Sequence, residues 1–277
     1  MEFINNILDF LSKEMNEPVA FSGFQESWFH YLSLVLVVIA IIFLTKMFKH
    51  ANQKQTKSII LVIGVILIGF EIYKQIIFSY SNDWHYRWYA FPFQFCSTVM
   101  FASLVVGLSK NKQLNETMIS FLATFSLFAG IAVMFYPGDV FVDTIGINIQ
   151  TMVHHGLMAA LGVSLIFSKK VSLSAETLFK GLLPMAFFWM VAILLNGIVN
   201  NYYPNIGVFN MFLINPRYHT SLPILSMIQP KVSAPVFQMI YLLGITFVSY
   251  ITFNLFVGMY KMKKWFVPAL KTKKQNI

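Results

Sequence analysis

The sequence is short of charge: Asp, Glu, Lys and Arg make up 11% of its 277 residues, against roughly 25% in a soluble domain. With 57% hydrophobic residues and a mean hydropathy of +0.66, this shortage excludes an ordinary soluble protein and indicates an integral membrane protein. Cysteine is scarcer still, and a single cysteine excludes an intrachain disulfide. Internal repeats and low-complexity segments are absent, which favours one domain.

Long apolar runs are what the sequence has instead. Seven of them reach the roughly 20 residues that a spanning helix needs, which predicts an all-α polytopic membrane protein, a bundle of seven transmembrane helices. The predicted spans are 29–48, 58–78, 91–108, 117–136, 148–168, 179–200 and 236–260. The chain then divides into an N-terminal interfacial segment, one transmembrane domain and a basic cytoplasmic tail, at 1–27, 28–260 and 261–277.

The first residues are acidic and lack the basic start of a signal peptide. Their apolar side chains recur with helical spacing, which predicts a short amphipathic helix lying in the membrane interface. These side chains are Phe3, Ile4, Ile7, Leu8 and Leu11.

The net charge of +9 is unevenly distributed. Fifteen of the twenty Lys and Arg residues follow the first, third, fifth and seventh spans, and only four lie in the opposite loops. The positive-inside rule therefore predicts an outside N-terminus and a cytoplasmic C-terminus. Because the basic charge accounts for topology, we expect a bilayer and no nucleic acid as its partner. The predicted location is a bacterial plasma membrane.

Polar side chains gather at one depth of the predicted bundle. Pro92 suits the first turn of the third span, and Cys96 lies about 8 Å further in at about 1.5 Å per residue. Polar groups in hydrocarbon are costly and usually functional. The residues that share this level, in the outer half of the membrane, are Glu71, Lys74, Gln94, Cys96, His154, His155 and Asn196.

Each of these residues also has a purely structural explanation. A lone membrane cysteine commonly packs as a small apolar side chain, and Glu71 with Lys74 can form a self-neutralising pair facing the bundle interior. One of two adjacent histidines, which point about 100° apart on a helix, can serve only to hydrogen-bond a neighbouring helix. Adjacent histidines are also a poor chelate, so we predict no metal and no other cofactor.

A thiol and an imidazole at equal depth are the minimum for nucleophilic catalysis by cysteine. The thiolate is the reactive form, so a base must lie within hydrogen-bond reach of the Cys96 sulfur. His155 is the candidate base, and Glu71 or Asn196 could orient its ring. At this depth the thiol would meet the acyl-ester carbonyls of lipids, which favours lipid acyl chemistry over aqueous hydrolysis.

Three motifs in order resemble the YwaF-type integral membrane family over roughly residues 84–225. They are Phe91-Pro92-Phe93-Gln94-Phe95-Cys96, His155-Gly156 and Asn210-Met211-Phe212-Leu213. This family is similar to the animal transmembrane protein 164, an acyltransferase that remodels ether phospholipids. The resemblance implies that Cys96 carries the acyl group and that His155 is its base. The chain departs from the family pattern by the extra His154, which leaves the acting imidazole open, and by a shortened stretch at Asn210.

We therefore predict a phospholipid acyltransferase in which Cys96 attacks an acyl ester and holds the chain as a thioester. A lysophospholipid or another acceptor then collects it, and His155 or His154 returns the proton. Gln94, Asn196 or a backbone N–H near Pro92 would stabilise the oxyanion. In the long connection 201–235, the candidates for binding the lipid phosphate are Arg217 and His219.

Two alternatives remain open. In a small-solute permease or its binding subunit, Glu71, Lys74 and the two histidines would line a substrate pocket or proton path. The absence of paired broken-helix repeats weakens that hypothesis. A structural protein without turnover is the third possibility. The oligomeric state is not predicted.

Overall fold

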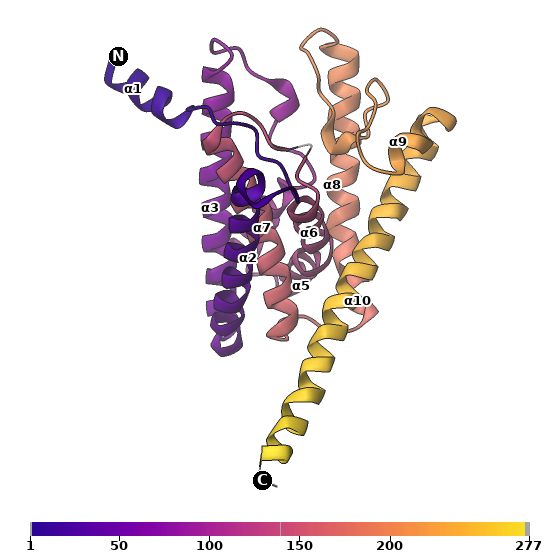
Figure 1. Cartoon of the computed structure of the whole chain (residues 1–277). Coiled ribbons are helices and arrows are strands. Elements are labelled where there is room, and N and C mark those ends of the chain that lie inside the picture. Colours follow the sequence, from indigo (N-terminus) through magenta and orange to yellow (C-terminus); the bar gives the residue numbers. More distant parts are fainter. Residues whose placement is uncertain (1, 139, 275–277) are drawn as a thin grey trace.

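The computed structural model describes residues 2–138 and 140–274, and the regular elements within them are all helices. Six are long and apolar enough to cross a membrane, and they run side by side as one bundle (Figure 1). The all-α membrane fold is thus confirmed, and six predicted spans coincide with these helices. They are α2 (Phe24–His50), α3 (Gln53–Tyr80), the continuous α5–η2–α6 (Lys112–Phe135), α7 (Ile145–Phe167), α8 (Ala175–Tyr202) and α10 (Ala234–Lys274).

Shorter elements connect or cover the long helices. Within the fourth predicted span, the π-helical turn η2 (Leu122–Ser126) joins α5 (Lys112–Phe121) to α6 (Leu127–Phe135). The others are α1 (Glu2–Leu11), α4 (Thr98–Leu108), α9 (Leu225–Ile228) and the 3-10 turns η1 (Trp88–Ala90), η3 (Met211–Leu213) and η4 (Gln229–Lys231).

The third predicted span is the one that differs. Its helix α4 begins at Thr98 rather than at Pro92 and, with 11 residues, extends only about 16 Å. Phe91, the residue before proline, is not helical and has ψ of 134°, as expected at a position that avoids the helical conformation. Residues 91–97 instead form a turn, in which the Phe93 amide bonds the Phe91 carbonyl. Cys96 therefore lies in this turn and not on a helix.

Helix α7 lies at the centre of the bundle, against α2, α3, α6 and α10. In its most apolar stretch 83% of the residues are buried, against 17% in α2. Glycines allow the close crossings: a Cβ on Gly162 would lie 2.6 Å from Leu127 Cβ on α6. The other helices of the bundle therefore surround the polar residues of α7.

The N-terminal helix forms as predicted. Leu8 of α1 packs against Ile77 and Ile147, and the Tyr73 hydroxyl donates to the Leu11 carbonyl at 2.6 Å. Phe3 and Phe10 remain exposed, so the interfacial position stays a prediction. At the other end, α10 continues past the predicted seventh span into the basic tail, of which residues 275–277 lie outside the described residues.

Candidate functional site

The turn 91–97 carries Cys96 at the edge of the bundle core. Cys96 is partly exposed, whereas Ser97 and Thr98 beside it are buried. Within the turn, the Ser97 amide donates to the Gln94 carbonyl at 2.9 Å. The Cys96 residue is thus largely covered by protein, while residues 91–95 before it in the turn are also partly exposed.

His154 is the imidazole that contacts the Cys96 residue. Its Nε2 lies 3.1 Å from the Cys96 carbonyl oxygen. Because a carbonyl only accepts hydrogen bonds, Nε2 carries the hydrogen and Nδ1 keeps a lone pair. That Nδ1 is buried and has no partner among the described residues. The ring of His154 is thus oriented and retains a free basic nitrogen.

His155 is held differently, by its own helix. Its Nδ1 donates to the Thr151 carbonyl at 2.8 Å, one turn earlier on α7, which leaves a lone pair on Nε2. Its ring centroid lies 5.4 Å from that of His154. The Thr151 carbonyl therefore orients this ring, a role for which Glu71 and Asn196 were the sequence candidates. A backbone carbonyl gives no residue-type signal, so sequence reasoning missed it.

Glu71 and Lys74 form the expected ion pair on α3. Lys74 Nζ lies 2.9 Å from Glu71 Oε1, and Gln75 Nε2 donates to the same oxygen at 2.6 Å. Glu71 is only 4% exposed, and its Oε2 has no partner among the described residues. Gln75 also donates to the Ala90 carbonyl at 2.7 Å, which joins this part of α3 to the residues just before the turn 91–97. The pair thus lies on a helix bound to the segment that leads into the Cys96 turn.

Tyr86, which the sequence did not single out, is partly buried near Glu71. Burial, and then the nearby Glu71 carboxylate, raise the pKa of Tyr86, so its hydroxyl remains a hydrogen-bond donor. Tyr86 lies in the loop between α3 and α4, where aromatic residues are frequent and no spacing distinguishes it from its neighbours.

Gln94 and Asn196 both bind backbone of the connection between α8 and α10. Asn196 donates to the Met211 carbonyl at 3.0 Å and accepts from the Met211 amide at 2.9 Å. Gln94 donates to the Asn210 carbonyl at 3.1 Å and accepts from the Phe212 amide at 3.0 Å. These two side chains therefore support the site by fixing the turn 210–212.

Asn210 has a structural contact as well: its Oδ1 accepts from the Asn215 amide at 2.9 Å. Asn215 in turn exchanges two hydrogen bonds with Asn200 on α8, at 2.9 and 3.1 Å. Asn215 was not predicted, although the run of asparagines could have suggested a network that closes the turn.

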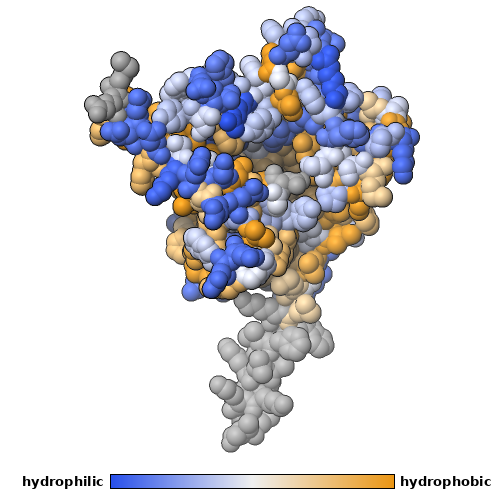
Figure 2. Space-filling view, turned by 45° about the horizontal axis from the view of Figure 1, so that its top comes forward, coloured by the Kyte–Doolittle hydropathy of each residue, from blue (hydrophilic) through white to orange (hydrophobic). Residues whose placement is uncertain are grey.

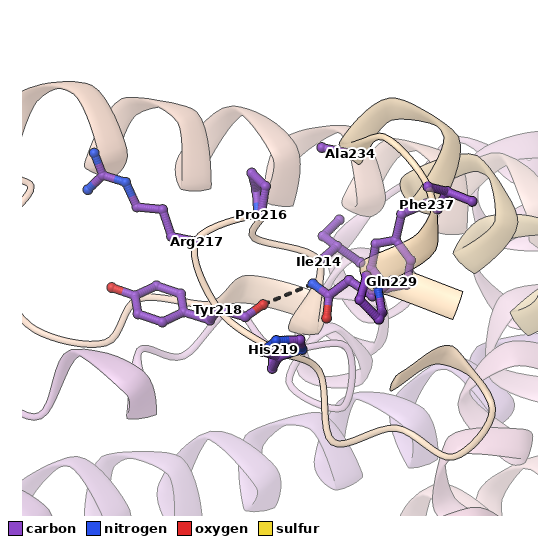
Figure 3. A pocket seen from close by; sticks show the side chains of 10 residues that line it. Ile214, Pro216, Arg217, Tyr218, His219, Gln229, Ala234 and Phe237 are labelled. Carbon is purple, nitrogen blue, oxygen red and sulfur yellow. Dashed lines mark hydrogen bonds between the residues drawn. The ribbon is translucent and has the colours of Figure 1, made fainter. Parts of the chain in front are cut away.

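Arg217 and His219 lie further out, beside a cavity of about 320 Å³. In Figure 3 the side chains of Arg217 and Tyr218 extend away from the group formed by His219, Gln229 and Phe237. Arg217 donates to the Asn200 carbonyl at 2.7 Å, and Gln229 donates to the Tyr218 carbonyl at 2.9 Å. Arg217 and His219 thus line this cavity, and Arg217 also ties the connection to α8.

The surface agrees with a membrane setting. Figure 2 shows hydrophilic residues over the end of the molecule that faces the viewer and hydrophobic ones along the flank. Among the described residues, no group of three or more His, Cys, Asp or Glu side chains could hold a metal ion.

A model of the TMEM164 family matches residues 21–260, which confirms the relation to transmembrane protein 164 expected from the motifs. No curated protein and no solved structure matches the chain.

Proposed function

The chain belongs to the TMEM164 family, and we propose that it is a phospholipid acyltransferase that carries the acyl group on Cys96. The observation that supports this best is the contact of the His154 imidazole with the Cys96 residue, beside a buried carboxylate and ammonium. In the orientation that we propose, the thiol and a base lie at the depth of the lipid esters.

In the proposed reaction the Cys96 thiol gives its proton to an imidazole, and the thiolate attacks an acyl-ester carbonyl. A thioester forms, and the departing lysophospholipid oxygen takes the proton from the imidazolium. The hydroxyl of a second lysophospholipid then attacks the thioester and returns its proton to the imidazole, which reprotonates the thiolate. No oxidant, metal or cofactor is needed for this exchange.

We assign the role of base to His154. Its ring contacts the Cys96 residue, and its Nδ1 is free to accept a proton. His155, the base implied by the family motif, keeps a free nitrogen too and is the alternative. For the oxyanion we favour backbone donors over the engaged amides of Gln94 and Asn196.

The backbone N–H groups of Phe95 and Cys96 donate to no backbone carbonyl among the described residues. Both precede α4 in the turn that carries the thiol. Donors that point at the developing charge and need no rearrangement are the usual means of stabilising an oxyanion.

We further propose seven crossings with the N-terminus outside and the C-terminus in the cytoplasm. Six crossings would return the chain to its starting side, but the two ends lie at opposite ends of the bundle (Figure 1). The turn 91–97 together with α4 would make the additional crossing, as the third apolar run predicts. The site then lies in the outer half of a plasma membrane, and the motifs favour the YwaF-type bacterial branch.

The outer cavity would receive the polar headgroup of the lipid. His219 lines it, and Arg217 lies at its margin with guanidinium donors beyond the one that binds Asn200. Both residues are candidates for the phosphate, and the acyl chains would remain in the bilayer.

The decisive experiment uses the purified protein in vesicles with a phospholipid labelled in its acyl chain and an unlabelled lysophospholipid. We expect label to appear on the protein in a hydroxylamine-sensitive bond and then on the acceptor, and both signals to vanish in Cys96→Ala. Equal transfer by wild type and Cys96→Ala would end the proposal.

The second candidate function is the permease, which the unpartnered Glu71 Oε2 favours as a buried proton or solute contact. In that case Cys96→Ser would keep solute uptake and Glu71→Gln would lose it. If the protein is an acyltransferase, neither variant should take up solute.

A further inference from the structure

The turn Asn210–Leu213 has a backbone conformation that its residues disfavour. Phe212 and Leu213 have φ of 59° and 58°, in the left-handed region where a side chain clashes with the backbone. Glycine would adopt this conformation without cost, yet neither position is glycine. Such a conformation persists only where the surroundings fix it. Here the side-chain amides of Asn196 and Gln94 hold the two peptide units before Phe212.

What the strained backbone achieves is the placement of one aromatic ring. The Phe212 side chain is 1% exposed, and its ring centroid lies 6.1 Å from that of Phe93 and 5.7 Å from that of Phe95. These two residues flank Gln94 in the turn that carries Cys96. The Phe212 ring therefore packs on the turn that carries Cys96, and the Gln94 side chain of the same turn binds the Phe212 backbone.

The Cys96 turn depends on such external contacts because it is not a helix. On one side His154 donates to the Cys96 carbonyl, and on the other side the Phe212 ring and backbone bind residues 93–95. Contacts across 58 and 118 residues of sequence thus fix the position of the turn. The long outer connection is in this way part of the site, although it supplies no reacting group.

We propose that Phe212, held by Asn196 and Gln94, is a positioning residue for the Cys96 thiol. The effect of Phe212 on catalysis rests on the proposed function. The position of the thiol is nevertheless measurable without any acyl transfer, because Cys96 is the single cysteine of the chain. Every alkylation of the folded protein by a maleimide reports on this one sulfur.

The test compares alkylation of the full-length protein in lipid nanodiscs by N-ethylmaleimide, well below the unfolding temperature of each variant. Phe212→Gly keeps the backbone conformation accessible and removes the aromatic ring. Leu213→Gly is the control: it also places a glycine at a positive φ but leaves the Phe212 ring in place. We expect Phe212→Gly to speed alkylation at least about fivefold, because the turn loosens and a small displacement changes reactivity strongly. Leu213→Gly should remain within about twofold of wild type, since its side chain is not the one packed on the turn.

The amides are tested separately, which keeps the proposal open to refutation if Phe212→Gly does not fold. Asn196→Ala removes both bonds to Met211, whereas Asn196→Asp keeps the acceptor for the Met211 amide and should restore part of the wild-type alkylation rate. In acyl transfer, the same variants should lower kcat more than they raise KM. Unchanged alkylation in both Phe212→Gly and Asn196→Ala would overturn the inference. Faster alkylation in a protein without acyl transfer would support it and refute the proposed function instead.

Discussion

The imidazole Nε2 of His154 lies 3.1 Å from the carbonyl oxygen of Cys96 and so joins α7 to the turn before α4. The contact runs to the backbone of the cysteine rather than to its sulfur. It fixes the ring and its tautomer while leaving Nδ1 without a partner. Catalytic hydrogen bonds in unliganded enzymes often tighten only when substrate binds. Which imidazole acts can therefore be decided by substitution.

We expect His154→Gln to lower the rate of acyl transfer by about 10²–10⁴-fold, the usual contribution of a general base. Glutamine can still donate to the Cys96 carbonyl but accepts no proton. The measurement is single-turnover formation of the acyl-enzyme in vesicles.

His155→Gln is the matched control, because it leaves the His154 contact in place. It should retain most of the acyl-transfer rate. If the two variants behaved in the opposite way, the base would be His155, as the family motif implies, and His154 would only hold the turn.

The apolar runs were sufficient to predict the helices because a spanning helix has to be apolar along its length. Five of the predicted spans begin and end within five residues of a helix, and the last begins within two residues of α10, which continues to Lys274. The third differed at its start, where residues 91–97 form a turn and Phe91, which precedes Pro92, is not helical. The ion pair of Glu71 with Lys74 was predictable too, since i, i+3 residues share a helical face.

The contacts that build the site could not be read from the sequence in the same way. Gln94 binds Phe212 across 118 residues, and the carbonyl that orients His155 belongs to Thr151, whose side chain has no part in it. Residue types and depth indicated which side chains would lie at one level. Only the fold could assign Asn196 and Gln94 to the backbone of the turn 210–212.

Glu71→Gln should destabilise the protein, because Lys74 would keep a largely buried charge without its counter-ion. Breaking a buried pair costs about 3–5 kcal/mol, and the partial exposure of Lys74 places the expected loss near the lower value. Thermal unfolding in detergent measures it. Adding Lys74→Met should recover most of the loss.

Lys180 provides the comparison for that prediction. It pairs with Glu116 and Glu176 at 3.3 and 2.9 Å, but all three side chains are at least 39% exposed. Exposed pairs contribute little to stability, so Lys180→Gln should scarcely change the unfolding temperature. If Lys180→Gln lowered the unfolding temperature as much as Glu71→Gln, burial would not determine the strength of the ion pair on α3.

The proposed topology predicts which positions an impermeant maleimide reaches in intact cells. In a Cys96→Ala background, cysteines replacing Ser81 and Tyr203 should be labelled from outside, and one replacing Lys110 only after permeabilisation. Ser81 follows α3 and Lys110 follows α4, so opposite labelling of these two would establish the third crossing. If the cysteines at positions 81 and 110 were labelled from the same side, α4 would not cross the membrane and the chain would have six crossings.

Gly130 on α6 should be indispensable for the geometry of α7. A Cβ there would lie 2.6 Å from the Ala159 amide nitrogen and 2.7 Å from the His155 carbonyl oxygen, both backbone atoms that cannot rotate away. Gly130→Ala should therefore separate the two helices, lower the free energy of unfolding by about 1–3 kcal/mol and displace the histidines from Cys96.

Gly244 on α10 provides the control. A Cβ there would meet no atom within 4 Å, so Gly244→Ala should be neutral or stabilising by up to about 1 kcal/mol through helix propensity. Thermal unfolding and acyl transfer measured on both variants would separate the effects. Full activity in Gly130→Ala would show that the site tolerates a wider crossing of α6 and α7 than its contacts imply.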